Sequence, residues 1–515
     1  MAAGSVKDTA VREVRPAGGG AVAGISAPGA PTTSHFPDGG PVSDSLPPAG
    51  STAGTSTVTR RAAGAGADAG AEEDDGWLWA ALGLETEVTE DATGAGLRGI
   101  VGLALRRNPR RAHLLVSRVL GKHLPVRPES ALAAAAALAA RARDLGAAGR
   151  AGGAPFVLGY CETATALGHA VADGFPDADY LHTTRRAVAG MRSELELAET
   201  HSHAVQHWLL PADPRLLTDP RPLLLVDDEL STGNTALGTI RALHALAPRP
   251  AYTVVTLLDA RPAASRARFD ELADELGVPV DVVSLVSATV TLPADVADRA
   301  RALRERHGGA NGAVDATRVD ASGGAALPPA GPATGPGALA PVTWLRPPWP
   351  AGLPDGGRHG WAPRHRGPLD EAVVDVAAAL AARLDQPGGR TLVLGTEELM
   401  YTPMRLASAL GQATGGDVRY QSTTRSPVYA LDVPGYAIRC ALEFPAPDDP
   451  GRASQVYNVA PGRYDDIVVV VDDGTDAAAP AAGDGPAPAG LVEALRRCAP
   501  VTVATLPSFA PAGAR

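Results

Sequence analysis

The stretch "LLLVDDELSTGNT", residues 223–235, decides both the fold class and the candidate site of this 515-residue chain. Four apolar residues in a row suit a strand that is buried on both faces, as in a parallel sheet. Asp227 and Asp228 end this run, and a small, hydroxyl-rich turn follows them directly. Because burial of carboxylates without partners is costly, we expect this acidic pair to serve a function and not stability.

Apolar runs alternate with helical patterns on both sides of this stretch, which predicts a doubly wound, parallel α/β sheet. Ligands of such sheets bind at the carboxyl ends of the strands, where Asp227 and Asp228 lie. The expected strands are 155–160, 222–228 and 251–260, and the expected helices are 130–145 and 265–277.

Composition limits the class of protein. A net charge of -11 argues against a general nucleic-acid or anionic-membrane surface. The three cysteines, Cys161, Cys440 and Cys498, are too few and too scattered for a disulfide framework or a zinc site. The sequence contains neither an apolar run long enough to span a membrane nor a signal peptide. We therefore expect a cytoplasmic protein with no membrane and no nucleic-acid partner.

Two stretches lack the large apolar side chains that a core requires. Residues 1–74 and 307–341 are rich in Gly, Ala and Pro, so they predict a disordered N-terminal tail and an interdomain linker. Between and after them, residues 76–306 and 342–510 carry strand and helix patterns. The expected architecture is therefore two α/β domains separated by the linker.

The turn after the acidic pair predicts a phosphate-binding loop. Gly233 supplies backbone freedom, and an apparent helix begins directly behind it. The free N–H groups and the positive dipole end of a helix N-terminus bind anions. A sugar phosphate satisfies both features, because ribose hydroxyls can donate to Asp227 and Asp228 while the 5′-phosphate lies in the loop. The carboxylates can also stabilise positive charge that develops on the ribose ring.

Strand, "VDDELSTGNT" and helix together resemble the phosphoribosyl pyrophosphate (PRPP) signature of type I phosphoribosyltransferases. The resemblance implies that Asp227 and Asp228 bind the ribose hydroxyls and are the catalytic pair. An ordinary capped helix would explain "STGNT" but not the two acids. The 5′-phosphate contacts that the resemblance implies come from Ser231, Thr232, Gly233, Asn234 and Thr235.

Two upstream motifs match the family's pyrophosphate contacts. "LGYCETATALGHAV" at 158–171 follows the first strand as the pyrophosphate-binding loop does, and "YLHTTRR" at 180–186 ends the next strand with paired arginines. "ETHSHAVQH" at 199–207 stands where type I enzymes carry a mobile lid. The candidate pyrophosphate contacts are Glu162, Thr163, Arg185, Arg186, Lys122, His201 and His203.

A specific argument supports Lys122, and competing interpretations exist for the histidines and for Cys161. Lys122 is one of only two lysines in an arginine-rich chain, which indicates a site that a guanidinium cannot serve. The spacing of His203 and His207 would place both on one helical face, as in a metal site. Without a carboxylate or cysteine nearby, we expect no metal there. Cys161 could be a nucleophile, but this transfer requires none, and a buried thiol is the simpler interpretation.

The second region adds a resemblance and an internal repeat. The motifs of the first region occur in the order shown by phosphoribosyltransferase-like proteins encoded with bacterial tellurite-resistance and stress operons. "QSTTRSPV" at 421–428 contains the T-R-S-P string that names the TRSP domain of these proteins. "VLGTEELMYTP", "YQSTTRS" and "VVVVDDGTD" also parallel "VLGYCETATAL", "YLHTTRR" and "LLLVDDELSTG" at a nearly constant offset. The repeat predicts a duplicated type I fold at 342–510.

This second copy is expected to be degenerate, because no T-G-x-T turn follows Asp472 and Asp473. We expect it to bind a PRPP-derived ligand without an ordinary phosphate loop. The competing interpretation is structural, with Pro427 fixing a bend and Arg425 in a salt bridge. The ligand contacts that the repeat predicts are Glu397, Glu398, Thr424, Arg425 and Ser426.

The resemblance implies that the protein transfers a phosphoribosyl group from PRPP, with Mg²⁺, to a nucleobase-like acceptor and releases pyrophosphate. The product would be a nucleotide-like metabolite linked to tellurite-resistance and stress operons. Several relatives carry an acid at the position of Ser231, so the hydroxyl argues against a purine acceptor. The competing functions are a non-catalytic PRPP sensor and a scaffold that binds no nucleotide. The sequence is also compatible with a homodimer.

Overall fold

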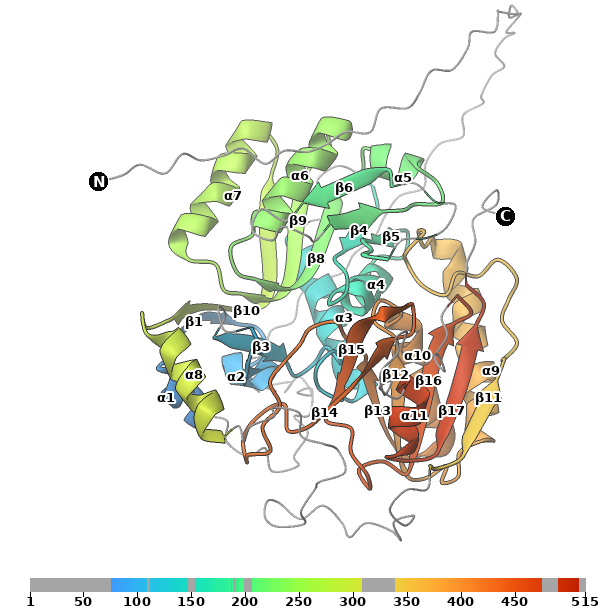
Figure 1. The fold of residues 1–515 in the computed structure, drawn as a ribbon. Coiled ribbons are helices and arrows are strands. Elements are labelled where there is room, and N and C mark those ends of the chain that lie inside the picture. Colours follow the sequence, from blue (N-terminus) through green and yellow to red (C-terminus); the bar gives the residue numbers. More distant parts are fainter. Residues whose placement is uncertain are drawn as a thin grey trace, which may run out of the picture. The chain divides into compact units, whose positions relative to one another are not determined.

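A six-stranded sheet in the order β1-β10-β9-β8-β4-β5 organises the first half of the chain (Figure 1). Five of its strands run parallel, and β1 pairs antiparallel with β10 at one edge. This confirms the expected parallel α/β class. The strands are β1 (Glu85–Asp91), β4 (Phe156–Gly159), β5 (Asp179–His182), β8 (Leu223–Leu230), β9 (Tyr252–Asp259) and β10 (Val280–Thr291).

The computed structural model describes residues 76–108, 112–146, 153–186, 188, 191, 193–198, 206–307, 339–474 and 490–508. The expected tail at 1–74 and nearly all of the expected linker at 307–341 lie outside the described residues.

Burial of β8 on both faces explains the apolar run at its start. Leu223 and Leu225 belong to the hydrophobic cluster formed with α6 and α7, whereas Leu224 and Val226 belong to the cluster formed with α3 and α4. Because successive side chains of a strand point to opposite faces, both faces of β8 need apolar residues. The four helices are α3 (Pro128–Asp144), α4 (Thr165–Asp173), α6 (Asn234–Leu246) and α7 (Ala263–Leu276).

The remaining elements of the first half extend this core. A β2–β3 hairpin joins α1, α2 and α8 in a separate cluster, and a β6–β7 hairpin follows β5 along the chain. These elements are α1 (Gly76–Leu82), α2 (Gly96–Ile100), β2 (Val101–Leu105), β3 (His113–Ser117), β6 (Leu195–Ala198), β7 (Gln206–Leu209), α5 (Arg215–Thr218) and α8 (Val296–His307).

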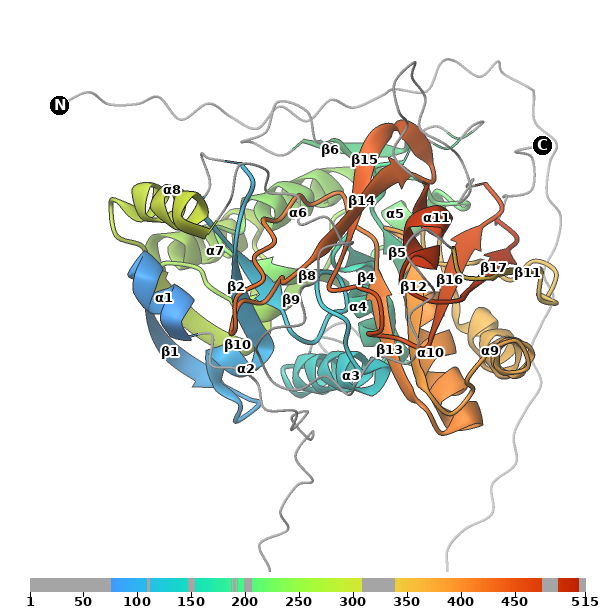
Figure 2. The same ribbon diagram turned by 60° about the horizontal axis from the view of Figure 1, so that its bottom comes forward.

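A second, fully parallel sheet in the order β11-β17-β16-β12-β13 forms in the second half. Figure 2 shows α9 and α10 on one side of it and α11 on the other. The elements are β11 (Val342–Leu345), η1 (Pro363–His365), α9 (Arg366–Ala381), β12 (Arg390–Gly395), α10 (Tyr401–Thr414), β13 (Asp417–Ser422), β14 (Ala441–Ala446), β15 (Asp449–Tyr457), β16 (Asp466–Asp472), α11 (Leu491–Arg496) and β17 (Val501–Leu506).

The two sheets share one topology, which confirms the expected duplication. Four strands repeat in chain order, β4, β5, β8 and β9 in the first sheet and β12, β13, β16 and β17 in the second. In both sheets the second of these strands lies at the edge, and the first, third and fourth follow it across the sheet. The position after the fourth strand is filled by β10 in the first sheet and by the preceding β11 in the second. Each sheet also carries an antiparallel hairpin, β6–β7 or β14–β15.

Each half contributes a segment that pairs with the edge strand of the other half. The Ser422 N–H donates to the Gly121 carbonyl at 2.7 Å, and Val126 pairs with Tyr420 in both directions, so a segment of the first half lies along β13. Reciprocally, the His182 N–H donates to the Gly357 carbonyl at 3.1 Å, and Trp361 pairs with Tyr180. We call residues 121–126 and 357–361 the crossing segments.

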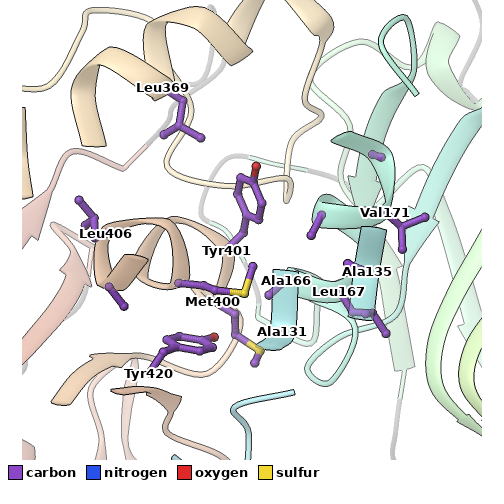
Figure 3. Packing of buried hydrophobic residues seen from close by; sticks show 14 of the residues in the cluster. Ala131, Ala135, Ala166, Leu167, Val171, Leu369, Met400, Tyr401, Leu406 and Tyr420 are labelled. Atoms are coloured by element: carbon purple, nitrogen blue, oxygen red, sulfur yellow. The ribbon is translucent and has the colours of Figure 1, made fainter. Parts of the chain in front are cut away.

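One hydrophobic cluster joins the halves behind these segments (Figure 3). Tyr401 of α10 stacks on His169 of α4, with ring centroids 3.6 Å apart, and its hydroxyl donates to Asp173. Burial lowers the pKa of His169 well below its usual value, so this ring is neutral and packs as an aromatic side chain. The helices behind both sheets therefore share a single core.

Candidate active site

Three consecutive acids lie at the carboxyl end of β8. The strand was expected to end at Asp228, but it continues to Leu230 because β9 runs beside it as far as Asp259. The Asp228 N–H donates to Oδ1 of Asp227 at 3.0 Å. Burial raises the pKa of Asp227, and repulsion from Asp228 adds to this effect. Burial also raises the pKa of Glu229, to about 7, with a further contribution from Asp228.

The raised pKa of Glu229 predicts that Glu229→Gln stabilises the ligand-free protein at alkaline pH. The folded-state pKa of about 7 exceeds the ordinary value of 4.5, so the fold is favoured below pH 4.5 and this advantage is lost as the pH rises through 7. A neutral amide avoids the loss. Thermal unfolding should show a gain of about 1–2 kcal/mol at pH 8 and almost none at pH 4.

The matched control for this prediction is Glu271→Gln, which removes an exposed carboxylate from α7. It should change stability equally little at both pH values. A gain for Glu229→Gln that is the same at pH 4 and pH 8 would contradict the raised pKa of Glu229.

The turn between β8 and α6 has the geometry of an anion-binding loop. Gly233 is the N-cap of α6 with φ of 72°, a conformation that favours glycine. A Cβ on Gly233 would lie 2.4 Å from the Phe269 ring, so a side chain has no space there. Ser231 and Thr232 are exposed, and Asn234 accepts a hydrogen bond from Arg268. The N-terminus of a 13-residue helix therefore opens beside the acids.

The loop after β4 brings a second group of candidate residues to the same end of the sheet. Lys122 Nζ donates to Oγ1 of Thr163 at 2.8 Å. Burial raises the pKa of both Glu162 and Asp228, and the Lys122 ammonium is the largest opposing influence on each. The structure thus brings together Lys122, Thr163, Glu162 and the acidic pair. Lys122 lies in the first crossing segment, so its backbone is held by β13.

The paired arginines separate. Arg185 Nη2 lies 2.9 Å from Nε2 of His207 in the first half. Arg186 instead reaches the second half, where Nη1 donates to Oδ2 of Asp472 at 2.7 Å and Nη2 donates to the Gly474 carbonyl at 3.0 Å. Arg186 is therefore not brought to the first site.

Of the three histidines in the expected lid, the structure describes His207. His201 and His203 lie outside the described residues, as does most of the lid at 199–207. His207 lies on β7, paired with Leu197, because the chain forms a hairpin here. The alternative placed His203 and His207 on one helical face, but His207 lies on a strand, and His203 is not described. Nδ1 of His207 lies 2.9 Å from Oγ1 of Thr183.

The loop glutamates of the two halves make reciprocal contacts. Glu162 accepts from Thr424 Oγ1 at 3.1 Å and from the Arg425 N–H at 3.3 Å. Glu398 accepts from Thr184 Oγ1 at 2.6 Å and from the Arg185 N–H at 2.8 Å. Each glutamate thus caps the T-T-R turn of the other half.

The residues predicted for the second site also come together. Arg425 Nε lies 2.7 Å from Oε2 of Glu397, so the salt bridge of the structural interpretation exists, and it lies inside the candidate site. The Ser426 N–H donates to Oγ1 of Thr424 at 3.1 Å. Ser426 therefore shapes the turn that carries Arg425.

Residues of the two sites that were not predicted include Thr183, His207, Glu229 and Arg358. Thr183 Oγ1 accepts from the Cys161 N–H at 2.9 Å, and Thr423 accepts from the Glu397 N–H at 3.1 Å in the second copy. The repeated T-T-R string was a signal for this role. Arg358 was detectable from the match between "GKH" at 121–123 and "GRH" at 357–359.

Burial raises the pKa of the Cys161 thiol well above its usual range, which disfavours the thiolate that a nucleophile requires. Within the described residues, no group of three or more His, Cys, Asp or Glu side chains is arranged to hold a metal ion. In the same part of the chain, no helix has the length and apolar content of a membrane span.

Known families and structures were compared with the chain. Residues 100–289 match the family described as phosphoribosyl transferase, and residues 355–495 match the TRSP domain, described as C-terminal to that transferase. No curated protein matches the chain.

Three solved structures show similarity at low TM-scores, which carry no argument about activity. The adenine phosphoribosyltransferase from Giardia lamblia, complexed with 9-deazaadenine, has 15% identity over 38% of this chain and 98% of that chain, with a TM-score of 0.25. The Rhodothermus marinus enzyme has 19% identity over 36% and 95%, with a TM-score of 0.25. The Trypanosoma brucei enzyme, in complex with AMP, pyrophosphate and ribose-5-phosphate, has 13% identity over 36% and 76%, with a TM-score of 0.25.

The two family matches include every motif that forms the two sites. The chain therefore contains a domain of the phosphoribosyl transferase family, followed by a TRSP domain.

Proposed function

We propose that the first site transfers a phosphoribosyl group from PRPP to a nucleobase-like acceptor. A nitrogen of the acceptor forms the bond to C1′ of ribose, the C1′–O bond to pyrophosphate breaks, and the acceptor loses its proton to solvent or a base. The observation that supports this reaction is the acidic pair of β8 beside the glycine-capped N-terminus of α6.

Each element of the site supports one requirement of this reaction. Asp227 and Asp228 would accept hydrogen bonds from the ribose hydroxyls, which would offset their mutual repulsion, and would stabilise positive charge on the ring. Lys122 would neutralise the departing pyrophosphate. The loop of 231–235 would hold the 5′-phosphate.

Mg²⁺ would enter with PRPP. Carboxylate oxygens of the type found at the end of β8 are ligands that Mg²⁺ prefers, so Asp227 and Asp228 fit the ion. The ion would supply positive charge near the pyrophosphate. We further propose that the reaction takes place in the cytoplasm and forms a nucleotide-like metabolite used by tellurite-resistance and stress systems, as the order of the motifs supports.

The test is mass spectrometry of the products formed from PRPP and a cell metabolite extract, together with a pyrophosphate assay. A new ribosylated product that appears with stoichiometric pyrophosphate is expected. A PRPP-dependent rise in melting temperature without pyrophosphate release would instead indicate a sensor, and no rise would indicate a scaffold.

A further inference from the structure

A cavity that opens to solvent lies at the carboxyl ends of β12 and β16, and the acids of β8 are not among its lining residues. It opens beside the loop that follows Gly395 and beneath the β14–β15 hairpin. Its lining residues are Arg186, Arg358, Thr396, Glu397, Glu398, Arg425, Pro447 and Asp448. Arg186 is the contribution of the first half, so both halves build this cavity.

Charges of both signs surround the cavity, but they lie at different depths. In each ion pair the guanidinium is the more exposed partner and the carboxylate lies beneath it. The exposed side-chain fractions are 19% for Arg186 above 3% for Asp472, 14% for Arg358 above 2% for Glu398, and 21% for Arg425 above 6% for Glu397.

In these three pairs the guanidinium groups are therefore nearer to solvent than the carboxylates that hold them, although Glu397 and Glu398 also reach the lining. An anion that enters from solvent would meet the guanidinium groups first. Buried acids that hold arginines in fixed orientations preorganise donors for oxyanions, because the guanidinium fork keeps free N–H groups on its outer side. Asp448 also lines the cavity, and burial together with Glu397 raises its pKa, which lessens its repulsion of an anion.

The duplication places this cavity where the first half has its candidate pyrophosphate loop. The N–H of Thr423 donates to Gly395 at 3.0 Å, as the N–H of Thr183 donates to Gly159 at 2.9 Å. Arg358 occupies the position of Lys122 in its crossing segment and lies 3.2 Å from Glu398. The second half therefore repeats the basic residue, the loop and the T-T-R turn.

We propose that this cavity is a second anion site, which binds the phosphate or diphosphate group of a metabolite independently of the transferase site. Arg186, Arg358 and Arg425 donate to the anion, and Asp472, Glu398 and Glu397 keep them in place. The site does not depend on catalysis at the acidic pair of β8.

Calorimetry of the full chain with inorganic pyrophosphate tests this site. We expect Arg186→Gln/Arg358→Gln to lose one binding event that Lys122→Met retains, because Lys122 does not line the cavity. Arg215→Gln is the matched control, since Arg215 is an exposed arginine paired with Asp213. Unchanged binding by the double variant, or no binding by the native chain, would overturn the proposal. This outcome is separate from pyrophosphate release, which tests the proposed function.

A second measurement uses the unmodified chain and does not depend on the folding of a variant. An arginine-selective dicarbonyl reagent is applied with and without pyrophosphate, and the modified residues are identified by mass spectrometry. We expect modification of Arg186, Arg358 and Arg425 to be at least about fivefold slower with pyrophosphate, because charge-assisted hydrogen bonds to the anion shield their guanidinium groups. Modification of Arg215 should not change. Equal rates at Arg186 and Arg358 would refute the site. Parallel runs with phosphate and ribose 5-phosphate distinguish a free diphosphate from a sugar-linked phosphate.

Discussion

Replacing both Asp227 and Asp228 by Asn is expected to lower pyrophosphate release from PRPP by roughly 10³-fold, the scale of a lost electrostatic stabiliser. The amide keeps the volume of each side chain and removes its charge. Positive charge on the ribose ring is then no longer stabilised, and the ring hydroxyls lose their strongest acceptors. Steady-state pyrophosphate release with saturating PRPP and Mg²⁺ measures the effect.

The same substitution should make the ligand-free protein more stable, which separates loss of function from loss of fold. Burial raises the pKa of both acids, and their mutual repulsion raises that of Asp227 further, so the charged pair disfavours the folded state at neutral pH. The melting temperature should therefore rise while turnover falls. Asp295→Asn, at an exposed site on the first half, is the control and should change neither. Native pyrophosphate release by the double variant would remove the pair from catalysis.

Gly121→Ala is expected to cost about 2–4 kcal/mol of unfolding free energy. Gly121 has φ of +77°, and an added Cβ would lie 2.5 Å from the ring of Tyr420. The substitution thus strains the backbone and pushes the first crossing segment away from β13. Because Lys122 is the next residue, pyrophosphate release should fall as well. Urea denaturation measures the stability change.

Gly94→Ala separates the two causes of that loss. Gly94 has φ of +70°, but nothing lies within 4 Å of a Cβ built on it, so only the backbone cost of about 1 kcal/mol remains. Shortening Tyr420 to Leu in the Gly121→Ala background should restore part of the lost stability. If both glycine variants lose the same free energy, the contact with Tyr420 contributes nothing.

Local pattern was enough to predict the sheet class, β8 and the turn behind it. Four apolar residues require burial on both faces of a strand, and Gly233 marks a positive φ that the structure contains. The duplication was also detectable, because buried strands and strand-end residues recur in the same order. These signals depend on residues within a few positions of one another.

Long-range pairing could not be predicted from the same pattern. Arg185 and Arg186 looked like one pair, but Arg185 lies beside His207 of the first half, whereas Arg186 bonds to Asp472 of the second half. His207 had helical spacing from His203, and only the partner strand β6 makes its segment extended. The crossing segments depend on contacts between residues far apart in sequence, which no local signal encodes.

The reciprocal crossing segments have a consequence for how this protein can change over time. Two identical subunits that exchanged such segments would have to use the same residue on both sides of their symmetric interface. Here both copies are encoded in one chain, so each position can be altered without altering its counterpart. Lys122 faces one loop and Arg358 the other, and Cys161 stands where the second copy has Glu397. A chain that carries both copies can therefore keep a phosphate loop in one copy while the other copy changes its ligand.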